Sequence, residues 1–401
     1  MAATLGAAND GSAGRNQRCS LTRHRREVSC RTREMMIAAI IIGVVQVVLL
    51  AQAVRNRKLF ALLRHVEQRS AGASISVCLP MRDEEANAER ILASITSELD
   101  CIAEVIVLDD GSTDRTPEIL RAFQVRYPGR VRIVNGKTKP SDWRAKVWAM
   151  QQLCEVATGD TLVFIDADVH LAPGALDSVL GAARQEESDF FSIFPRQITT
   201  RSTDLLVDHL FTTLLHLLPM QFVSEAAYPS AVAGCGQLQV ITRSALSRIG
   251  GYASLRESLH DGLHSARLVK RSGDRVGFAY GADLVSCEMY PSFREAWRGF
   301  TRNAFQASVN APALVLTSAI MLGAFVAGPL LLLCGSPAAI IALSPTVVLY
   351  LHYVFIARTF DLRPDFVLRL PLSVVLSTAV QWWSFIKDKL GIRTTWRGRA
   401  A

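Results

Sequence analysis

Short apolar runs that end in acidic residues recur through the first half of the chain. Residues 161–165 are Thr, Leu, Val, Phe and Ile, and the run stops at Asp166 and Asp168. A run without a polar face predicts a strand that is buried on both sides. Two carboxylates at its carboxyl end would lie at the sheet edge where open α/β folds bind ligands. They suit a hard divalent cation, although a strand end followed by an Asx turn would read the same.

Two earlier runs repeat this arrangement. Residues 75–80 end at a proline with an acidic stretch beyond it, and residues 104–109 lead into a second acidic end and the turn residue Gly111. Another strand fits residues 131–135, and helical patterns separate the runs, the last over residues 143–156. Strands that alternate with helices predict a doubly wound, mostly parallel, Rossmann-like α/β sheet. Its first, second and fourth strands would bring acidic residues to one edge.

The order of these motifs resembles the nucleotide-binding half of a family 2 glycosyltransferase with the GT-A fold. Residues 234–251 also resemble the Gly-rich acceptor-side strand and helix of that family, beginning with Gly234 and Gly236. The resemblance covers residues 74–306, which we expect to form the catalytic domain. The matching motifs in the nucleotide-binding half are Pro80, Glu84, VLDDGSTD over 107–114, Lys146 and DAD over 166–168.

Three further features resemble one branch of that family, the membrane-anchored hopanoid-associated and carotenoid-type members. They are the run KTKPSDWRAKVWAMQQ over 137–152, the apolar segments downstream of the catalytic domain, and the closing TWRGR over 395–399. The resemblance implies a nucleotide-sugar donor and a lipid acceptor.

The resemblance also implies roles for the donor-side residues. Asp168 would hold Mg²⁺ or Mn²⁺, and Asp166 would contact the metal or the ribose. Asp110, supported by Asp109, would accept a hydrogen bond from the nucleobase. Each role has a structural alternative, because residues 109–114 could simply form a turn with a helix cap. The remaining donor-side roles are Glu84 near the base and ribose, where Glu85 could replace it, and Lys146 at the diphosphate, where it could be an ordinary solvated lysine.

Asp261 falls where the family places its catalytic base. Transfer to a hydroxyl requires a base that removes the acceptor proton as the sugar carbon is attacked. A single carboxylate opposite the leaving group predicts one displacement with inversion. The alternative is an N-cap for the helix over 262–273. His260 replaces the family's common acidic neighbour on the acceptor side.

Long apolar segments predict a membrane protein, and half of the residues are hydrophobic. We expect a disordered basic leader over 1–34, a transmembrane helix over 35–55, membrane helices within 311–390 and a basic tail over 391–401. Met35 and Met36 suggest a second hypothesis, in which translation starts there.

The three carboxyl-terminal apolar segments are 311–335, 337–357 and 366–386, the last interrupted by Arg369 and Pro371. Three crossings would put the basic tail opposite the catalytic domain, against the positive-inside tendency. We therefore expect one segment to be re-entrant or interfacial, or the first helix not to cross fully. Residues 204–223 could be core or membrane contact, and residues 292–307 read as an interfacial helix.

The charge pattern favours membrane lipids over nucleic acid. The net charge of +8 gathers in the tails and near the first apolar segment, without basic residues interleaved with aromatic ones on a recognition element. Scattered cysteines without a Cys-x-x-Cys pair suit a catalytic domain that faces a reducing cytosol. We expect a multi-pass inner-membrane enzyme that transfers a single sugar to a lipid hydroxyl. The alternatives are a processive polysaccharide synthase and a non-catalytic membrane scaffold that retains the fold.

Overall fold

A long helix opens the part of the chain that is described. The computed structural model describes residues 11–60, 62–65, 74–225, 228, 230–307, 310–333, 337–392, 395–396 and 399–400. Helix α1 runs continuously from Gly11 to Leu59. The expectation of disorder up to residue 34 is therefore wrong for residues 11–34, while residues 1–10 lie outside the described part. After Gly14 the segment contains no glycine or proline before Gly43, and arginine is a good helix former, so the helix continues through it.

The centre of the chain forms the predicted doubly wound, mostly parallel sheet. Its strand order is β3-β2-β1-β4-β8-β6-β9. The first four strands in that order are parallel, β8 is antiparallel to both β4 and β6, and β9 is parallel to β6. The strands are β1 (Ile75–Met81), β2 (Glu104–Asp109), β3 (Val131–Asn135), β4 (Thr161–Ile165), β6 (Phe190–Phe194), β8 (Leu238–Thr242) and β9 (Val276–Tyr280).

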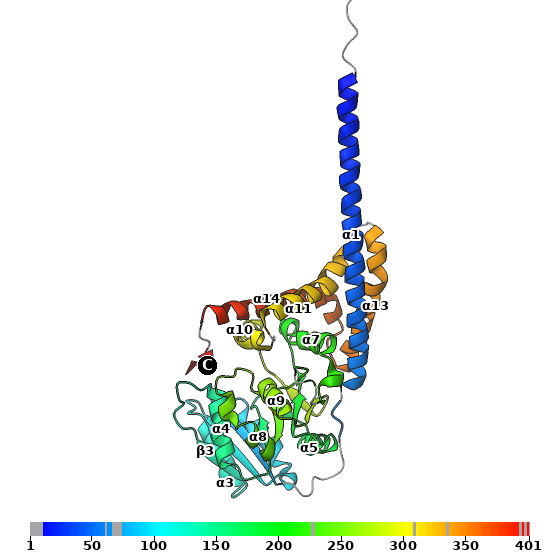
Figure 1. Ribbon diagram of the computed structural model, residues 1–401. Helices are drawn as coiled ribbons and strands as arrows, with labels where there is room; N and C mark the ends of the chain where they lie inside the picture. The colour runs from blue at the N-terminus through cyan, green and yellow to red at the C-terminus, as the bar shows by residue number, and fades with distance from the viewer. Residues whose placement is uncertain are drawn as a thin grey trace, which may run out of the picture.

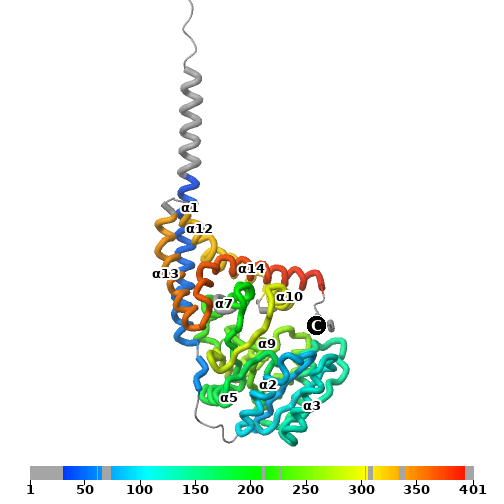
Figure 2. Tube along the Cα trace, turned by 180° about the vertical axis from the view of Figure 1, so that it is seen from behind, coloured from blue at the N-terminus to red at the C-terminus, as the bar shows by residue number. Residues whose placement is uncertain are grey.

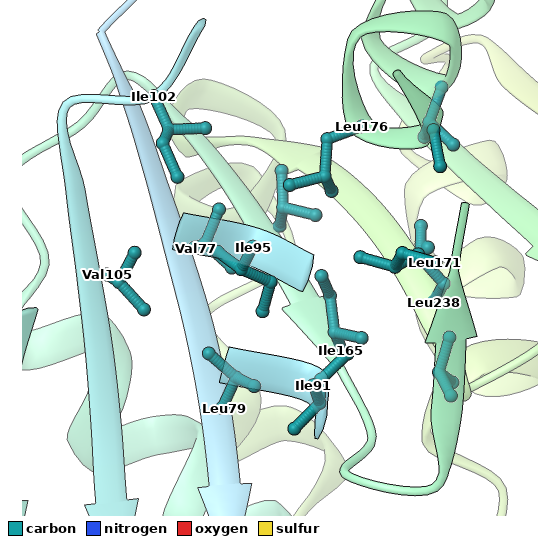
Figure 3. Packing of buried hydrophobic residues seen from close by; sticks show 14 of the residues in the cluster. Val77, Leu79, Ile91, Ile95, Ile102, Val105, Ile165, Leu171, Leu176 and Leu238 are labelled. Carbon is teal, nitrogen blue, oxygen red and sulfur yellow. The ribbon is translucent and has the colours of Figure 1, made fainter. Parts of the chain in front are cut away.

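Helices cover both faces of this sheet, which explains why most positions in its central strands are apolar. Alternate residues of β1 point to opposite faces: Val77 and Leu79 meet one layer of helices and Cys78 meets the other. Figure 3 shows the first layer, with Val77, Leu79 and Val105 facing Ile91 and Ile95. That layer contains α2 (Ala88–Thr96), α3 (Thr116–Arg126) and α5 (Ala175–Gln185), and the other contains α4 (Ala145–Val156), α8 (Arg243–Arg248) and α9 (Asp261–Arg271).

Several short elements complete the described fold. A small sheet joins β5 (Val169–Leu171), β10 (Val285–Cys287) and β7 (Arg196–Gln197) in that order. Single 3₁₀ turns occupy Leu99–Cys101, Met220–Phe222, Tyr252–Leu255 and Ala304–Ala307. Near the carboxyl terminus, β11 (Thr395–Trp396) pairs with β12 (Arg399–Ala400).

Four helical segments of the described chain are long and apolar enough to cross a membrane: Cys30–Leu59, Ala311–Leu333, Ala339–Thr359 and Phe366–Lys389. The second consists of α11 (Ala311–Leu322), a π-helical turn (Gly323–Ala327) and α12 (Gly328–Leu333). Helix α13 (Pro337–Thr359) packs along α1, and buried Gln46 of α1 donates to Thr346 Oγ1 at 2.9 Å. Helix α14 (Phe366–Lys389) instead runs across α1 and α13, above the catalytic domain (Figures 1 and 2).

Three further helices contact the candidate membrane helices: α6 (Asp204–Val207), α7 (His209–Leu217) and α10 (Phe293–Asn303). Figure 1 shows α7 and α10 between the sheet and α14. Leu215 of α7 joins the core formed by the candidate membrane helices, so this segment is both core and a contact to them. The aromatic residues of α10, Phe293 and Trp297, pack against α6 and α14. The expected interfacial face of α10 is thus covered by protein, because α14 lies over it.

Candidate active site at the carboxyl edge of the sheet

The parallel register brings the predicted acidic residues to one edge. Met81 at the end of β1 pairs with Asp109 at the end of β2, which pairs with Asn135 at the end of β3. Asp166 follows the last residue of the parallel neighbour β4 directly. The backbone N–H of Asp166 donates to the carbonyl of Gln237 at 2.9 Å, which ties the end of β4 to the antiparallel strand β8.

Lys146 lies between two of the predicted site carboxylates. Its Nζ is 2.8 Å from Asp166 Oδ1 and 3.3 Å from Asp261 Oδ2, and it also donates to the carbonyl of Gly236 at 3.2 Å. Helix α4 presents the lysine from its first turn, and its side chain is only 25% exposed. Lys146 is therefore not an ordinary solvated surface lysine: it joins the end of β4 to the start of α9.

Asp261 is held by a second polar contact. Gln239, which is fully buried in the middle of β8, donates from Nε2 to Asp261 Oδ2 at 3.0 Å. Helix α9 begins at Asp261 itself, and the residue at its N-cap position is His260, whose side chain makes no capping bond. The alternative of Asp261 as an N-cap is therefore wrong. Its carboxylate faces Lys146 and Gln239 in the cavity described below.

The two predicted glycines allow β8 to approach the start of α9 closely. A Cβ on Gly236 would lie 2.7 Å from Asp261 Oδ2, and a Cβ on Gly234 would lie 2.5 Å from the carbonyl oxygen of Gly262. Either contact is shorter than a side-chain carbon tolerates. Asp261 can therefore occupy its observed position only because residues 234 and 236 have no side chain.

The electrostatics of the cluster are dominated by negative charge. Asp166, Asp168 and Asp261 carry a formal charge of −3 and Lys146 carries +1, so these four residues together carry −2. Burial raises the pKa of Asp166 to about 7; Lys146 lowers it in part, and Asp168 and Asp261 raise it. The three carboxylates outweigh the burial of Lys146 and raise its pKa. The cluster therefore favours an added positive charge.

The donor set of this cluster fits a divalent cation. Within the described residues, no group of three or more His, Cys, Asp or Glu side chains forms a complete metal cage. Mg²⁺ and similar ions often use only one or two protein carboxylates and take the remaining ligands from water and substrate phosphates. Asp166 and Asp168 both line the cavity at the strand end, and a dication would balance the formal charge of the four-residue cluster.

The other donor-side residues divide into two groups. Pro80 and Glu84 line the cavity, and Asn87 donates to Glu84 Oε2 at 2.8 Å. Asp109 and Asp110 stand at the same sheet edge but do not line that cavity. Asp109 Oδ1 accepts a hydrogen bond from the Ser112 N–H at 2.9 Å, so Asp109 stabilises the turn that follows β2.

Asp110 is buried beside a cation that sequence reasoning missed. Its side chain is 6% exposed, and Arg82 Nη1 lies 4.0 Å from its Oδ2. Arg82 also donates to the backbone carbonyl of Asp110. Glu85, the alternative to Glu84, points elsewhere: its Oε2 accepts from the Arg115 N–H at 3.1 Å. The geometry thus favours Glu84 over Glu85 as the residue near a ligand.

One cavity of about 1400 Å³ runs from these carboxylates to the candidate membrane helices. Its polar end contains Glu84, Lys146, Asp166, Asp168 and Asp261. The opposite end is lined mainly by aliphatic and small residues of α7, α11 and α14. Arg298 and Arg302 of α10 line the cavity between the two ends, so these arginines face the site and not the bilayer.

Sequence reasoning missed Gln239 and the two cavity arginines of α10. Gln239 is the one strongly polar side chain in the middle of the strand LQVIT, and an amide in a buried strand requires a partner. That signal could have pointed to it. The arginines followed the spacing of an amphipathic helix, which does not distinguish a face toward lipid from a face toward a cavity.

Comparison with known proteins identifies the catalytic part. Residues 76–274 match the family described as "Glycosyl transferase family 2". The chain therefore contains a family 2 glycosyltransferase domain, as its motifs predicted.

Two curated relatives have the same name, "4,4'-diaponeurosporenoate glycosyltransferase". The one from Staphylococcus haemolyticus is 27% identical over 247 residues, which cover 61% of this chain and 64% of the relative. The one from Staphylococcus aureus (strain bovine RF122) is 31% identical over 130 residues, which cover 32% of this chain and 33% of the relative. Each match thus spans less than two thirds of the relative's length. The shared name agrees with the predicted resemblance to carotenoid-type members.

A solved structure supports the GT-A fold. The mannosyltransferase PcManGT from Pyrobaculum calidifontis, solved in complex with GDP-Man and Mn²⁺, aligns with a TM-score of 0.53. The alignment covers 89% of this chain and 99% of that protein at 18% identity. At this identity the likeness concerns the fold alone.

Proposed function

We propose that this chain is a membrane-anchored, metal-dependent, inverting glycosyltransferase that moves one sugar from a nucleotide-sugar donor to a lipid hydroxyl. The single observation that carries this proposal is the continuous cavity that joins the carboxylate cluster to the candidate membrane helices. A soluble donor and an apolar acceptor can meet only where an aqueous site and an apolar surface share one space.

The donor occupies the polar end. Asp166 and Asp168 would hold Mg²⁺ or Mn²⁺, which would supply positive charge to stabilise the departing phosphate. Glu84 and Pro80 line the nucleotide side of the cavity, while Asp109 and Asp110 stand at the neighbouring strand end to receive the base. Lys146, already between two carboxylates, is positioned to contact the diphosphate.

Asp261 is the proposed base. Gln239 and Lys146 fix one of its oxygens, and both Asp261 and His260 line the cavity where an acceptor can approach. Removing the proton of an attacking hydroxyl at this carboxylate supports a single displacement, in which the sugar carbon is attacked opposite the leaving phosphate and inverts. Gly234 and Gly236 keep the acceptor-side wall close to this residue.

Two alternatives are a processive polysaccharide synthase and a non-catalytic scaffold. A processive polysaccharide synthase would release long chains, but members of that kind carry a Gln/Arg-x-x-Arg-Trp signature that is absent here, where Trp297-Arg298 and Arg302-Asn303 stand instead. A non-catalytic scaffold would not require Lys146 to connect two intact carboxylates. We therefore favour transfer of a single sugar.

The name shared by the two relatives supports a second acceptor class. Diaponeurosporenoate is, by its name, a carboxylate, and a carboxylate acceptor would attack without losing a proton. Arg298 and Arg302 in the cavity wall could receive such an anion. Mild alkali distinguishes the two products, because it cleaves a glycosyl ester and leaves a glycoside intact.

The orientation of α14 supports a topology with three crossings. We propose that α1, α11–α12 and α13 cross the inner membrane and that α14 lies along its surface over the catalytic domain (Figures 1 and 2). The catalytic domain over 74–306 and the basic tail over 391–401 then share the cytoplasmic side, in accord with the positive-inside tendency. This arrangement removes the conflict that three carboxyl-terminal crossings would create.

The test is donor screening with purified membranes. Membranes that contain the chain are incubated with radiolabelled nucleotide sugars, and the label in extracted lipid is counted and sized. We expect one donor to label a lipid that carries a single sugar, and no label with Asp261→Asn. Label in long polymers, or equal lipid label from the Asp261→Asn membranes, would overturn the proposal.

A further inference from the structure

The membrane end of the cavity has a defined wall that the proposed chemistry does not use. Residues from three helices line it, and two of these helices, α11 and α14, belong to segments apolar enough to cross a membrane. Most of these lining residues are small or aliphatic, although Gln381 and Lys387 of α14 also line the cavity. They include Leu214 and Leu217 of α7, Ala313, Thr317, Ser318 and Met321 of α11, and Ser377, Thr378 and Val380 of α14.

The hydroxyl groups in this wall are already bonded within their own helices. Thr317 Oγ1 donates to the carbonyl of Ala313 at 2.8 Å, and Thr378 Oγ1 donates to that of Val374 at 2.7 Å. Ser318 and Ser377 likewise donate to the carbonyls four residues earlier. Such back-bonding uses the donor of each hydroxyl, so the wall does not require polar groups from a ligand.

A histidine of α7 also lines this wall, with its buried Nδ1 unpaired among the described residues. His209 of α7 lines the cavity, and its Nε2 lies 3.1 Å from Thr213 Oγ1. Burial lowers the pKa of His209 to about 4, so the imidazole is neutral at physiological pH. A sugar chain would need many hydrogen-bonding partners along this wall, whereas a hydrocarbon needs none.

The wall is continuous with the catalytic carboxylates and adjoins surfaces suited to lipid. The same cavity contains Asp261 at its other end. On the outer sides of the helices, Leu316 of α11 is 61% exposed and Val375 of α14 is 42% exposed. Large apolar side chains exposed on candidate membrane helices indicate contact with acyl chains. Only the width of α11 and α14 therefore separates the cavity from the bilayer.

We propose that the hydrocarbon chain of the lipid acceptor lies in this groove between α7, α11 and α14, and that it enters from the bilayer between α11 and α14. The chain then extends toward Asp261, which places its reactive end at the sheet edge. This inference rests on the proposed function, since it locates the acceptor of that reaction. The small residues Ala313, Ser377 and Thr378 leave the space that the chain fills.

The test uses a photoactivatable probe and two matched pairs of variants. The probe is hexadecanol with a diazirine near its methyl end, supplied in phosphatidylglycerol vesicles that contain the full chain. Thr378→Trp and Thr317→Trp fill the groove from α14 and α11. Val375→Trp and Leu316→Trp place the same side chain on the outer face of the same helices. Labelled peptides are mapped by mass spectrometry, and hydrolysis of the nucleotide sugar without acceptor is measured in parallel.

We expect the wild-type chain to be labelled on the cavity side of α11 and α14. Each groove variant should lose this label at least about tenfold, because a tryptophan displaces several methylenes of the chain. The outer variants should retain it. Donor hydrolysis should remain at the wild-type rate in all four variants, which shows that each is folded.

Two results overturn the inference: equal labelling in Thr378→Trp and Val375→Trp, or label confined to the outer faces. If one groove variant does not fold, the variant on the other helix decides. Failure of the proposed function is distinguishable, because it would appear as absent donor turnover in the wild-type chain whether or not the groove takes up the probe.

Discussion

Lys146 Nζ lies 3.3 Å from Asp261 Oδ2, so the first turn of α4 contacts the first residue of α9 through one ion pair. The same amine is 2.8 Å from Asp166 Oδ1. A lysine shared by the proposed metal ligand and the proposed base couples their charges. A change at Lys146 or Asp261 therefore alters the pKa of Asp166.

Removing this lysine should raise the pKa of Asp166, because Lys146 is the neighbour that lowers it. We expect Lys146→Met to reduce kcat/KM by about 10²–10³-fold and to move the acid limb of the pH profile to higher pH. The measurement is transfer against pH from 5.5 to 9. Lys137→Met, at a lysine that is 72% exposed and pairs with Glu155, serves as the control and should match wild type. An unshifted acid limb in Lys146→Met would contradict the coupling.

Replacing the base should abolish transfer to a hydroxyl. We expect Asp261→Asn to lower kcat by about 10²–10⁴-fold, since general base catalysis supplies a factor of that size. The asparagine retains an oxygen for Gln239, so thermal unfolding should change little. Asp142→Asn, at an exposed aspartate, is the matched control. Full activity would remove Asp261 from its role, and a small loss with an alkali-labile product would favour the carboxylate acceptor.

Metal binding should depend on pH through Asp166. Its pKa of about 7 means that a proton occupies this carboxylate below neutral pH. A cation must displace that proton, so apparent Mn²⁺ affinity should fall about tenfold per pH unit below 7 and level off above it. Calorimetric titration at pH 6, 7 and 8 measures this. Asp166→Asn should bind more weakly and lose the pH dependence; equal affinities at pH 6 and 8 in the wild-type chain would contradict the prediction.

Removing the metal should stop transfer without unfolding the chain. We expect chelation with EDTA to abolish lipid labelling, Mn²⁺ or Mg²⁺ to restore it, and Asp168→Ala to remain inactive at saturating metal. These ions often bind through only one or two protein carboxylates, so the loss of one is expected to be severe. Activity of Asp168→Ala equal to wild type would exclude this residue as a ligand.

Gly236 should tolerate no side chain. A methyl group there would meet Asp261 Oδ2 at 2.7 Å and force the carboxylate to move. We expect Gly236→Ala to reduce kcat by about 10²-fold, the typical cost of a displacement near 1 Å at a reacting group. Gly323→Ala is the control, because a methyl group at Gly323 has no neighbour within 4 Å. Wild-type kinetics for Gly236→Ala would mean that the position of Asp261 is not critical.

The attachment of α14 should depend on one buried ion pair. Arg369 donates from both guanidinium ends to Asp204, at 2.9 and 2.6 Å, and the Asp204 side chain is fully buried. We expect Arg369→Leu to destabilise the chain by about 3–5 kcal/mol, because a buried carboxylate loses its main partner. Thermal unfolding in detergent measures this. Arg275→Leu, which breaks an exposed pair with Glu187, should change stability by less than about 1 kcal/mol.

The sheet and its acidic edge could be predicted because they rest on local signals. A strand buried on both faces reads as an unbroken apolar run, and parallel strands end at the same edge, so Asp109 and Asp166 had to stand on one side. The observed bounds of β3 and β4 are the predicted ones. The sequence motif pointed to Gly236, but the reason for a glycine there, its close approach to Asp261, is visible only in the structure.

The contacts among site residues could not be predicted, because they join distant segments. Lys146, Asp261 and Gln239 come from different elements, and spacing along the chain does not show that they meet. The sequence also did not determine the direction in which α14 runs. A helix long enough to cross a bilayer can also lie along it, and the choice depends on packing such as the Arg369–Asp204 pair.

The chemically different ends of the cavity also affect what happens after transfer. In the proposed reaction, the nucleoside diphosphate would leave toward water, past the edge of the sheet, and the glycosylated lipid would return to the bilayer between the helices. Because the two products do not share an exit, added nucleotide should inhibit competitively against the donor and non-competitively against the acceptor. With separate exits, the proposed enzyme would release its lipid product even while spent nucleotide still occupies the polar end of the cavity.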